Sequence, residues 1–141
     1  MTGINTGKVL VGGLVGGLVM NVIDIATGYL ILMNDMKAML ERLHLDASSL
    51  DSPASMIPWV IIDFISGILL VFAYAAMRPR FGPGPKTAFI AGLTMYLMIT
   101  VVLSGFLSVG IFTTGVFVKS AACSLVSVLA ASLTGAAVYK E

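Results

Sequence analysis

Residues 8–24 read KVLVGGLVGGLVMNVID, and the fold follows from this stretch. Lys8 precedes an uncharged run that continues, interrupted only by Asp24, to about residue 33. A transmembrane helix needs about 20 mainly apolar residues to cross the hydrocarbon core of a bilayer. The run is too long for the apolar part of a cleaved signal peptide, and it contains an acid. We therefore expect a membrane-spanning helix.

Three further apolar segments follow along the chain. Of its 141 residues, 58% are hydrophobic and only 11% are charged, about half the charge of a typical soluble domain. The alternating short segments of a membrane β-barrel are absent. We expect an all-α integral membrane protein, a single membrane domain over residues 1–141, with its four helices in an antiparallel bundle. The predicted spans cover about residues 8–33, 57–77, 87–110 and 112–139.

Basic residues predict the orientation of these spans. The segment 78–86, RPRFGPGPK, contains Arg78, Arg80 and Lys86 and no acid, and Lys8 and Lys140 flank the outermost spans on the same side. The opposite side, residues 34–56, has only two basic residues and several acids. Cytoplasmic loops carry an excess of Lys and Arg, so we expect both termini in the cytoplasm.

Two segments outside the spans have predicted conformations. Prolines and glycines predict that the cytoplasmic linker 78–86 is stiff and not helical. Residues 34–46 alternate apolar and charged side chains at helical spacing, which predicts a short amphipathic helix lying at the outer interface after the first span.

The stretch KVLVGGLVGGLVMNVID and the later AAMRPRFGPGPKTA together resemble small uncharacterised bacterial four-span proteins with a similar R-P-R-F-G-P-G-P motif. This resemblance implies a location in the bacterial inner membrane. It implies no catalytic activity.

Small residues predict how the helices pack. Membrane helices associate through close contacts of small side chains and through polar contacts. At about 100° per residue, Gly13, Gly17 and Gly28 share one stripe of the first helix with Asp24. A second ridge of small side chains in the fourth span contains Ser120, Ser124 and Ser127. We expect both surfaces to be helix contacts, and the glycines also offer a face for self-association.

Ionisable side chains inside the spans form a candidate polar cluster. Asp24 lies roughly 13 Å from the outer end of its helix, and Asp63 and Lys119 roughly 9 Å from theirs. We expect the two acids to face the bundle interior, with Asn21 and Tyr96 as hydrogen-bond partners, and Lys119 either to reach them or to extend to the outer interface. Two carboxylates that share one cation at low dielectric are not both ionised comfortably, so one would bind and release a proton. The alternative is an ionic cluster that only fixes the register of the helices.

Met33, Met36, Met39 and His44 form a second candidate site on the outer side. Thioethers and an imidazole suit Cu(I). However, Leu40 and Leu43 extend the apolar stripe that Met36 and Met39 begin, which favours the packing face of the amphipathic helix.

These observations lead to three readings of function. The first is a helix-packing accessory or assembly subunit, or a homo-oligomer, without catalysis. The second is a small proton- or cation-coupled transporter or channel that uses Asp24, Asp63 and Lys119. The third is Cu(I) binding at the outer face. We expect the lipid bilayer, other membrane subunits or a second copy as partners. We expect neither a cofactor, nor nucleic acid, nor enzymatic activity.

Overall fold

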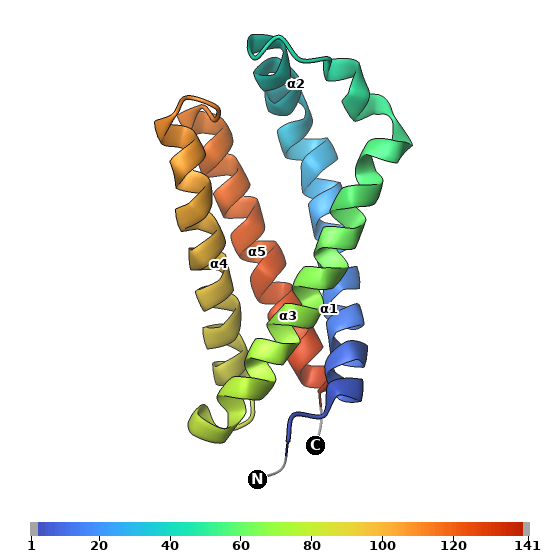
Figure 1. Ribbon diagram of the computed structural model, residues 1–141, viewed down its shortest axis with the longest axis vertical. Helices are drawn as coiled ribbons and strands as arrows, with labels where there is room; N and C mark the ends of the chain where they lie inside the picture. The colour runs from blue at the N-terminus through green and yellow to red at the C-terminus, as the bar shows by residue number, and fades with distance from the viewer. Residues whose placement is uncertain (1–2, 140–141) are drawn as a thin grey trace.

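The computed structural model describes residues 3–139, and every regular element in that range is helical. The elements are α1 (Thr6–Thr27), the π-helix η1 (Gly28–Leu32), α2 (Met33–Arg42), the 3-10 helices η2 (Ala47–Asp51) and η3 (Pro53–Met56), α3 (Ile57–Phe81), α4 (Pro85–Ser108) and α5 (Thr114–Val138). The four long helices run alternately up and down as a bundle (Figure 1). The prediction of an all-α four-helix membrane fold is confirmed.

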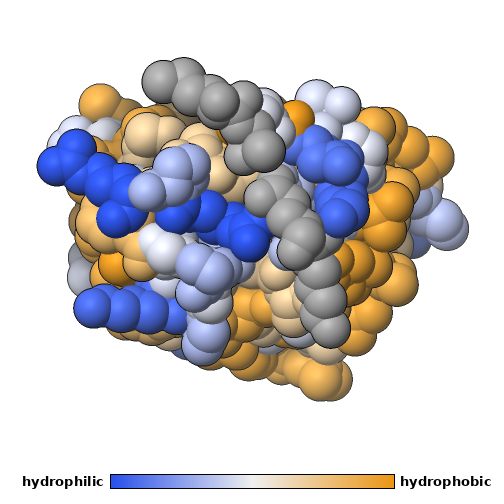
Figure 2. Space-filling view, turned by 90° about the horizontal axis from the view of Figure 1, so that it is seen from below, coloured by the Kyte–Doolittle hydropathy of each residue, from blue (hydrophilic) through white to orange (hydrophobic). Residues whose placement is uncertain are grey.

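In the part of the chain that the structure describes, four helical segments are long and apolar enough to cross a membrane. They are Thr6–Arg42, Pro53–Phe81, Pro85–Ser108 and Thr114–Val138. Seen from the end where α1 begins and α5 ends, hydrophilic side chains gather across the end and apolar ones cover the flanks (Figure 2). This distribution is that of a multi-pass membrane protein, whose flanks face lipid and whose ends face water.

Helix α1 lies between α3 and α5 and contacts both through glycine. A Cβ atom at Gly17 would lie 2.7 Å from the Cα of Phe64, and one at Gly12 would lie 2.7 Å from the carbonyl oxygen of Gly135. Gly13 faces Ile68 of α3 in the same way. These contacts bring backbone against backbone, so the glycines are covered within one chain and are not free for self-association.

Gly28 does not belong to this contact surface, which corrects the predicted stripe. A Cβ atom at Gly28 would meet nothing within 4 Å. Gly28 begins the π-helix η1 and, like Asp24, lines the cavity described below, so it still points into the bundle. At this height the facing helices have diverged (Figure 1), which leaves no helix contact at Gly28.

The closely packed core lies toward the end of the bundle where α1 begins. One cluster of buried residues there includes Val71, Tyr74 and Ala88, and a second one around Leu70 and Val128 continues it toward the middle. Both clusters stop short of the opposite end, where α4 and α5 diverge from α1 and α3 (Figure 1). This opposite half, which we call the outer half for its distance from the start of α1, therefore has room for a cavity.

The linker 78–86 is mostly helical, contrary to the prediction. Helix α3 continues through Pro79 to Phe81, and α4 begins at Pro85. Pro79 lies in the last turn, so its missing amide removes a single hydrogen bond from the helix, which ends at Gly82 with a φ of 82°. The short turn is held by Thr87, whose hydroxyl donates to the carbonyl oxygen of Gly82 at 2.6 Å.

The short amphipathic helix predicted after the first span is present as α2, which the helical backbone joins to α1 through η1. The backbone stays helical from Thr6 to Arg42, and in Figure 1 α2 continues upward from α1. At 1.5 Å per residue this path is about 55 Å long, well beyond a hydrocarbon core of about 30 Å. Helix α2 therefore extends outward beyond the bilayer core.

Candidate functional site

A cavity of about 410 Å³ occupies the outer half of the bundle. We call it the outer cavity. All four long helices and the π-helix contribute to its wall, with Asp24, Tyr29, Trp59, Asp63, Thr100 and Ser124 among the lining residues. Its volume is within the range of small-molecule sites, and like them it is mostly apolar with a few polar groups.

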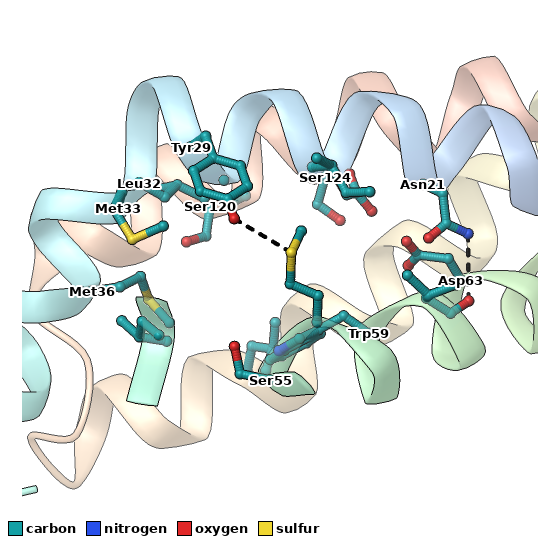
Figure 3. A pocket seen from close by; sticks show the side chains of 18 of the residues that line it. Asn21, Tyr29, Leu32, Met33, Met36, Ser55, Trp59, Asp63, Ser120 and Ser124 are labelled. Atoms are coloured by element: carbon teal, nitrogen blue, oxygen red, sulfur yellow. Dashed lines mark hydrogen bonds between the residues drawn. The ribbon is translucent and has the colours of Figure 1, made fainter. Parts of the chain in front are cut away.

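Asn21 lies at the end of the outer cavity that is nearer the packed core, which we call the inner end. Two carbonyl groups orient its side chain (Figure 3). Its amide nitrogen donates to the oxygen of Gly17 at 2.9 Å and to that of Val60 at 3.4 Å. Both acceptors are carbonyls, so the nitrogen must face them and Oδ1 must face away. Asn21 is 6% exposed, yet Oδ1 has no hydrogen-bond partner.

Asp24 and Asp63 bring two carboxylates to the same end of the cavity. Asp63 is 7% exposed and interacts electrostatically with Asp24. The hydroxyl of Ser127 lies within interaction range of Asp24, although its geometry falls short of a hydrogen bond. None of the described residues that line the cavity is basic. The inner end thus gathers hydrogen-bond acceptors and negative charge without a cation.

The prediction that Lys119 joins these acids is wrong. Its Nζ forms an ion pair with Oδ2 of Asp35 on α2 at 2.6 Å. Because α2 continues outward beside the start of α5, Asp35 is at the height of Lys119, whereas Asp24 lies about three helical turns further in. Both side chains of the pair are partly exposed.

Tyr96 is also not part of the polar cluster. It packs against the core cluster that contains Met20 and Leu70. Of the predicted polar cluster, Asn21, Asp24 and Asp63 line the outer cavity together, whereas Tyr96 is close to the packed half of the bundle and does not line it.

The predicted serine ridge of α5 divides between two environments. Ser127 is completely buried in the bundle. Ser124 and Ser120, about one and two turns nearer the outer end, line the outer cavity instead of forming a helix contact. Their placement differs from the prediction because α5, together with α4, diverges from α1 and α3 on this side (Figure 1).

The structure does not bring Met33, Met36, Met39 and His44 together, so the pattern considered for Cu(I) is not a site. Met33 and Met36 line the outer cavity (Figure 3). Met39 is buried and lines a second, smaller cavity, with Asp35 and Val116. His44 is exposed in a turn with a φ of 58°.

Sequence reasoning missed the aromatic and sulfur-containing wall of the cavity. Phe112, Phe117 and Met56 line it, and the hydroxyl of Tyr29 donates to the sulfur of Met56 at 3.4 Å. These residues come from separate segments that meet only in the tertiary structure. No spacing in the sequence connects them.

Comparison of the chain with models of protein families, with curated proteins and with solved structures gives no match. The geometry of the outer cavity is therefore the basis for a function.

Proposed function

We propose that this protein is a proton-coupled carrier of a small cation, with Asp24 and Asp63 as the cation-binding groups. The observation that carries the proposal is the meeting of two carboxylates at the inner end of a cavity with no basic lining residue. Acidic residues within membrane spans commonly mark ion pathways and proton relays.

A proton and a cation would compete for the same place. Asp24 comes from α1 and Asp63 from α3, while α4 and α5 contribute only uncharged groups such as Thr100 and Ser124. Two carboxylates in this setting are not both ionised comfortably. A proton held by one of them offsets the repulsion and supplies a donor for Oδ1 of Asn21. An arriving cation replaces that proton, which leaves to water.

We place the protein in the bacterial inner membrane with its termini in the cytoplasm. The end where α1 begins and α3 ends carries Lys8, Arg78, Arg80 and Lys86, and the positive-inside rule supports a cytoplasmic side there. Lys140, which belonged to the same prediction, lies outside the described residues. The outer cavity would then open toward the periplasmic side.

The reading as an assembly subunit has less support. Gly12, Gly13 and Gly17, the surfaces that suggested self-association, are covered by α3 and α5 of the same chain. A carrier with only four spans still needs a second copy to complete a path through the membrane, so we expect a homo-oligomer in contact through other surfaces.

Proton flux in proteoliposomes tests the proposal. With a pH-sensitive dye inside, external guanidinium chloride should drive proton release in vesicles that contain the protein. Guanidinium suits the test because it stays charged at every working pH. The paired variant Asp24→Asn with Asp63→Asn should lose the flux, while the surface variant Asp46→Asn should keep it. A flux that is equal in all three proteins would overturn the proposal.

A further inference from the structure

The acceptors at the inner end of the outer cavity have a geometry that selects among cations. Oδ1 of Asn21 and the carboxylate of Asp63 face the same space (Figure 3), and Asp24 lines it from the same helix as Asn21. A buried acceptor without a donor is unfavourable, because it has lost its hydrogen bonds to water. Three acceptor groups therefore favour a ligand that carries several N–H donors as well as a positive charge.

The rest of the cavity is unsuited to a bare inorganic ion. Tyr29, Met33, Met36, Met56 and Trp59 line it on the outer side of the acids. Trp59 lies about one helical turn before Asp63, and Met56 lies about two turns before Asp63. This apolar wall therefore continues for roughly 10 Å. A lone ion at Asp63 would leave the greater part of 410 Å³ facing apolar side chains.

We propose that the outer cavity binds a protonated primary amine attached to an aromatic or similarly compact apolar body. The ammonium group donates to Oδ1 of Asn21 and to the carboxylates of Asp24 and Asp63. The apolar body lies between Trp59 of α3 and the side chains of Met33 and Met36 of α2. Aromatic and sulfur-containing surfaces of this kind bind rings well. This inference rests on the proposed function, because it names the class of cation that the carrier takes.

Trp59 provides a direct measurement, since it is the only tryptophan of the chain and lines the cavity. The protein is placed in nanodiscs of uncharged phosphatidylcholine, and its fluorescence is titrated with phenethylamine, with nanodiscs without protein as the blank. We expect a saturable change. The Asp63→Asn variant should weaken it by roughly tenfold or more, because a charge-assisted hydrogen bond is lost. Asp46→Asn, the same change at an exposed position, should leave it unaltered.

Three matched ligands separate the parts of the inference. Trimethyl(phenethyl)ammonium keeps the charge and the ring but has no N–H donor, and it should bind roughly tenfold more weakly. Methylammonium keeps the donors and lacks the ring. It should bind at least tenfold more weakly than phenethylamine, because it loses the affinity gained by burying the ring. Phenethyl alcohol, which lacks the charge, should give no saturable change.

The possible failures are distinguishable. Equal binding of the trimethyl compound would overturn the assignment of the three acceptors. If methylammonium bound as tightly as phenethylamine, the inference that the ligand has an apolar body would be overturned. The proposed function, tested by the guanidinium-driven proton flux, would be unaffected. An unchanged titration in Asp63→Asn would overturn the site itself, and Asp24→Asn is the second variant if Asp63→Asn is not recovered as a folded protein.

Discussion

Three polar side chains lie inside a bundle that is otherwise mainly apolar: those of Asn21, Asp24 and Asp63. The side chain of Asn21 is partly satisfied by two backbone carbonyls, whereas the carboxylate of Asp63 accepts no hydrogen bond from the described residues. Buried charges that stabilise a fold are usually paired, and breaking such a pair is costly. Asp63 has a like-charged neighbour instead, so its contribution to stability is small or unfavourable.

This reasoning predicts the effect of Asp63→Asn on stability. The substitution keeps the shape and removes the charge, so the free energy of unfolding should stay the same or rise by about 1 kcal/mol. Thermal unfolding in detergent, followed by circular dichroism, measures the change. A variant that is less stable by more than about 1 kcal/mol would show that Asp63 is a structural residue.

Gly17 and Gly28 belong to the same predicted stripe, but we expect alanine substitutions at the two positions to affect stability differently. In Gly17→Ala the new methyl group would press on the backbone of Phe64 and Asp63, so α1 and α3 must separate. We expect a loss of about 1–3 kcal/mol. Gly28→Ala meets open space and should be neutral or slightly stabilising. Titration with a denaturing detergent compares the two, and equal losses would contradict the helix contact.

At the scale of the elements, the continuous path from α1 through the π-helix into α2 decides what the outer half of the bundle can do. Tyr29 and Leu32 of the π-helix and Met33 at the start of α2 line the outer cavity, and α2 then reaches the helix hairpin of α4 and α5. Arg42 of α2 donates to the carbonyl oxygen of Ile111 in that hairpin at 2.6 Å. Polar contacts outside the membrane thus hold α2 beside α5.

The ion pair of Asp35 with Lys119 tests this placement. Asp35→Lys and Lys119→Asp each bring like charges together, and because the pair is partly exposed each should cost about 0.5 kcal/mol or a little more. The double exchange should recover most of that loss. A double-mutant cycle of melting temperatures gives the coupling, and a coupling of zero would mean that α2 does not lie beside α5.

The whole molecule has two unlike halves. The half where the chain begins contains the buried core, and it ends in basic residues. The other half contains the outer cavity and the longer extramembrane segment with α2, η2 and η3. A packed half that supports a mostly apolar cavity with a few polar groups is a suitable arrangement for a binding site.

Reporter fusions test the orientation of these halves. Alkaline phosphatase is active only outside the cytoplasm, so a fusion after Gly110 should be active and one after Gly82 inactive. A green fluorescent protein at the same positions should give the opposite pattern. Active phosphatase at Gly82 would reverse the proposed orientation and turn the cavity toward the cytoplasm.

Hydropathy along the sequence determined the number and type of the long helices, because crossing a bilayer demands a local run of apolar residues. The sequence also identified Gly13, Gly17, Asn21, Asp24 and Asp63 as notable, because spacing within one regular helix is a local property. Neighbours from different helices depend on tilt and relative height, which non-local packing decides. For that reason only the tertiary structure paired Lys119 with Asp35, separated Met39 from Met36 and opened the outer cavity. It also showed that the helices facing Gly28 have diverged, which spacing within one helix does not reveal.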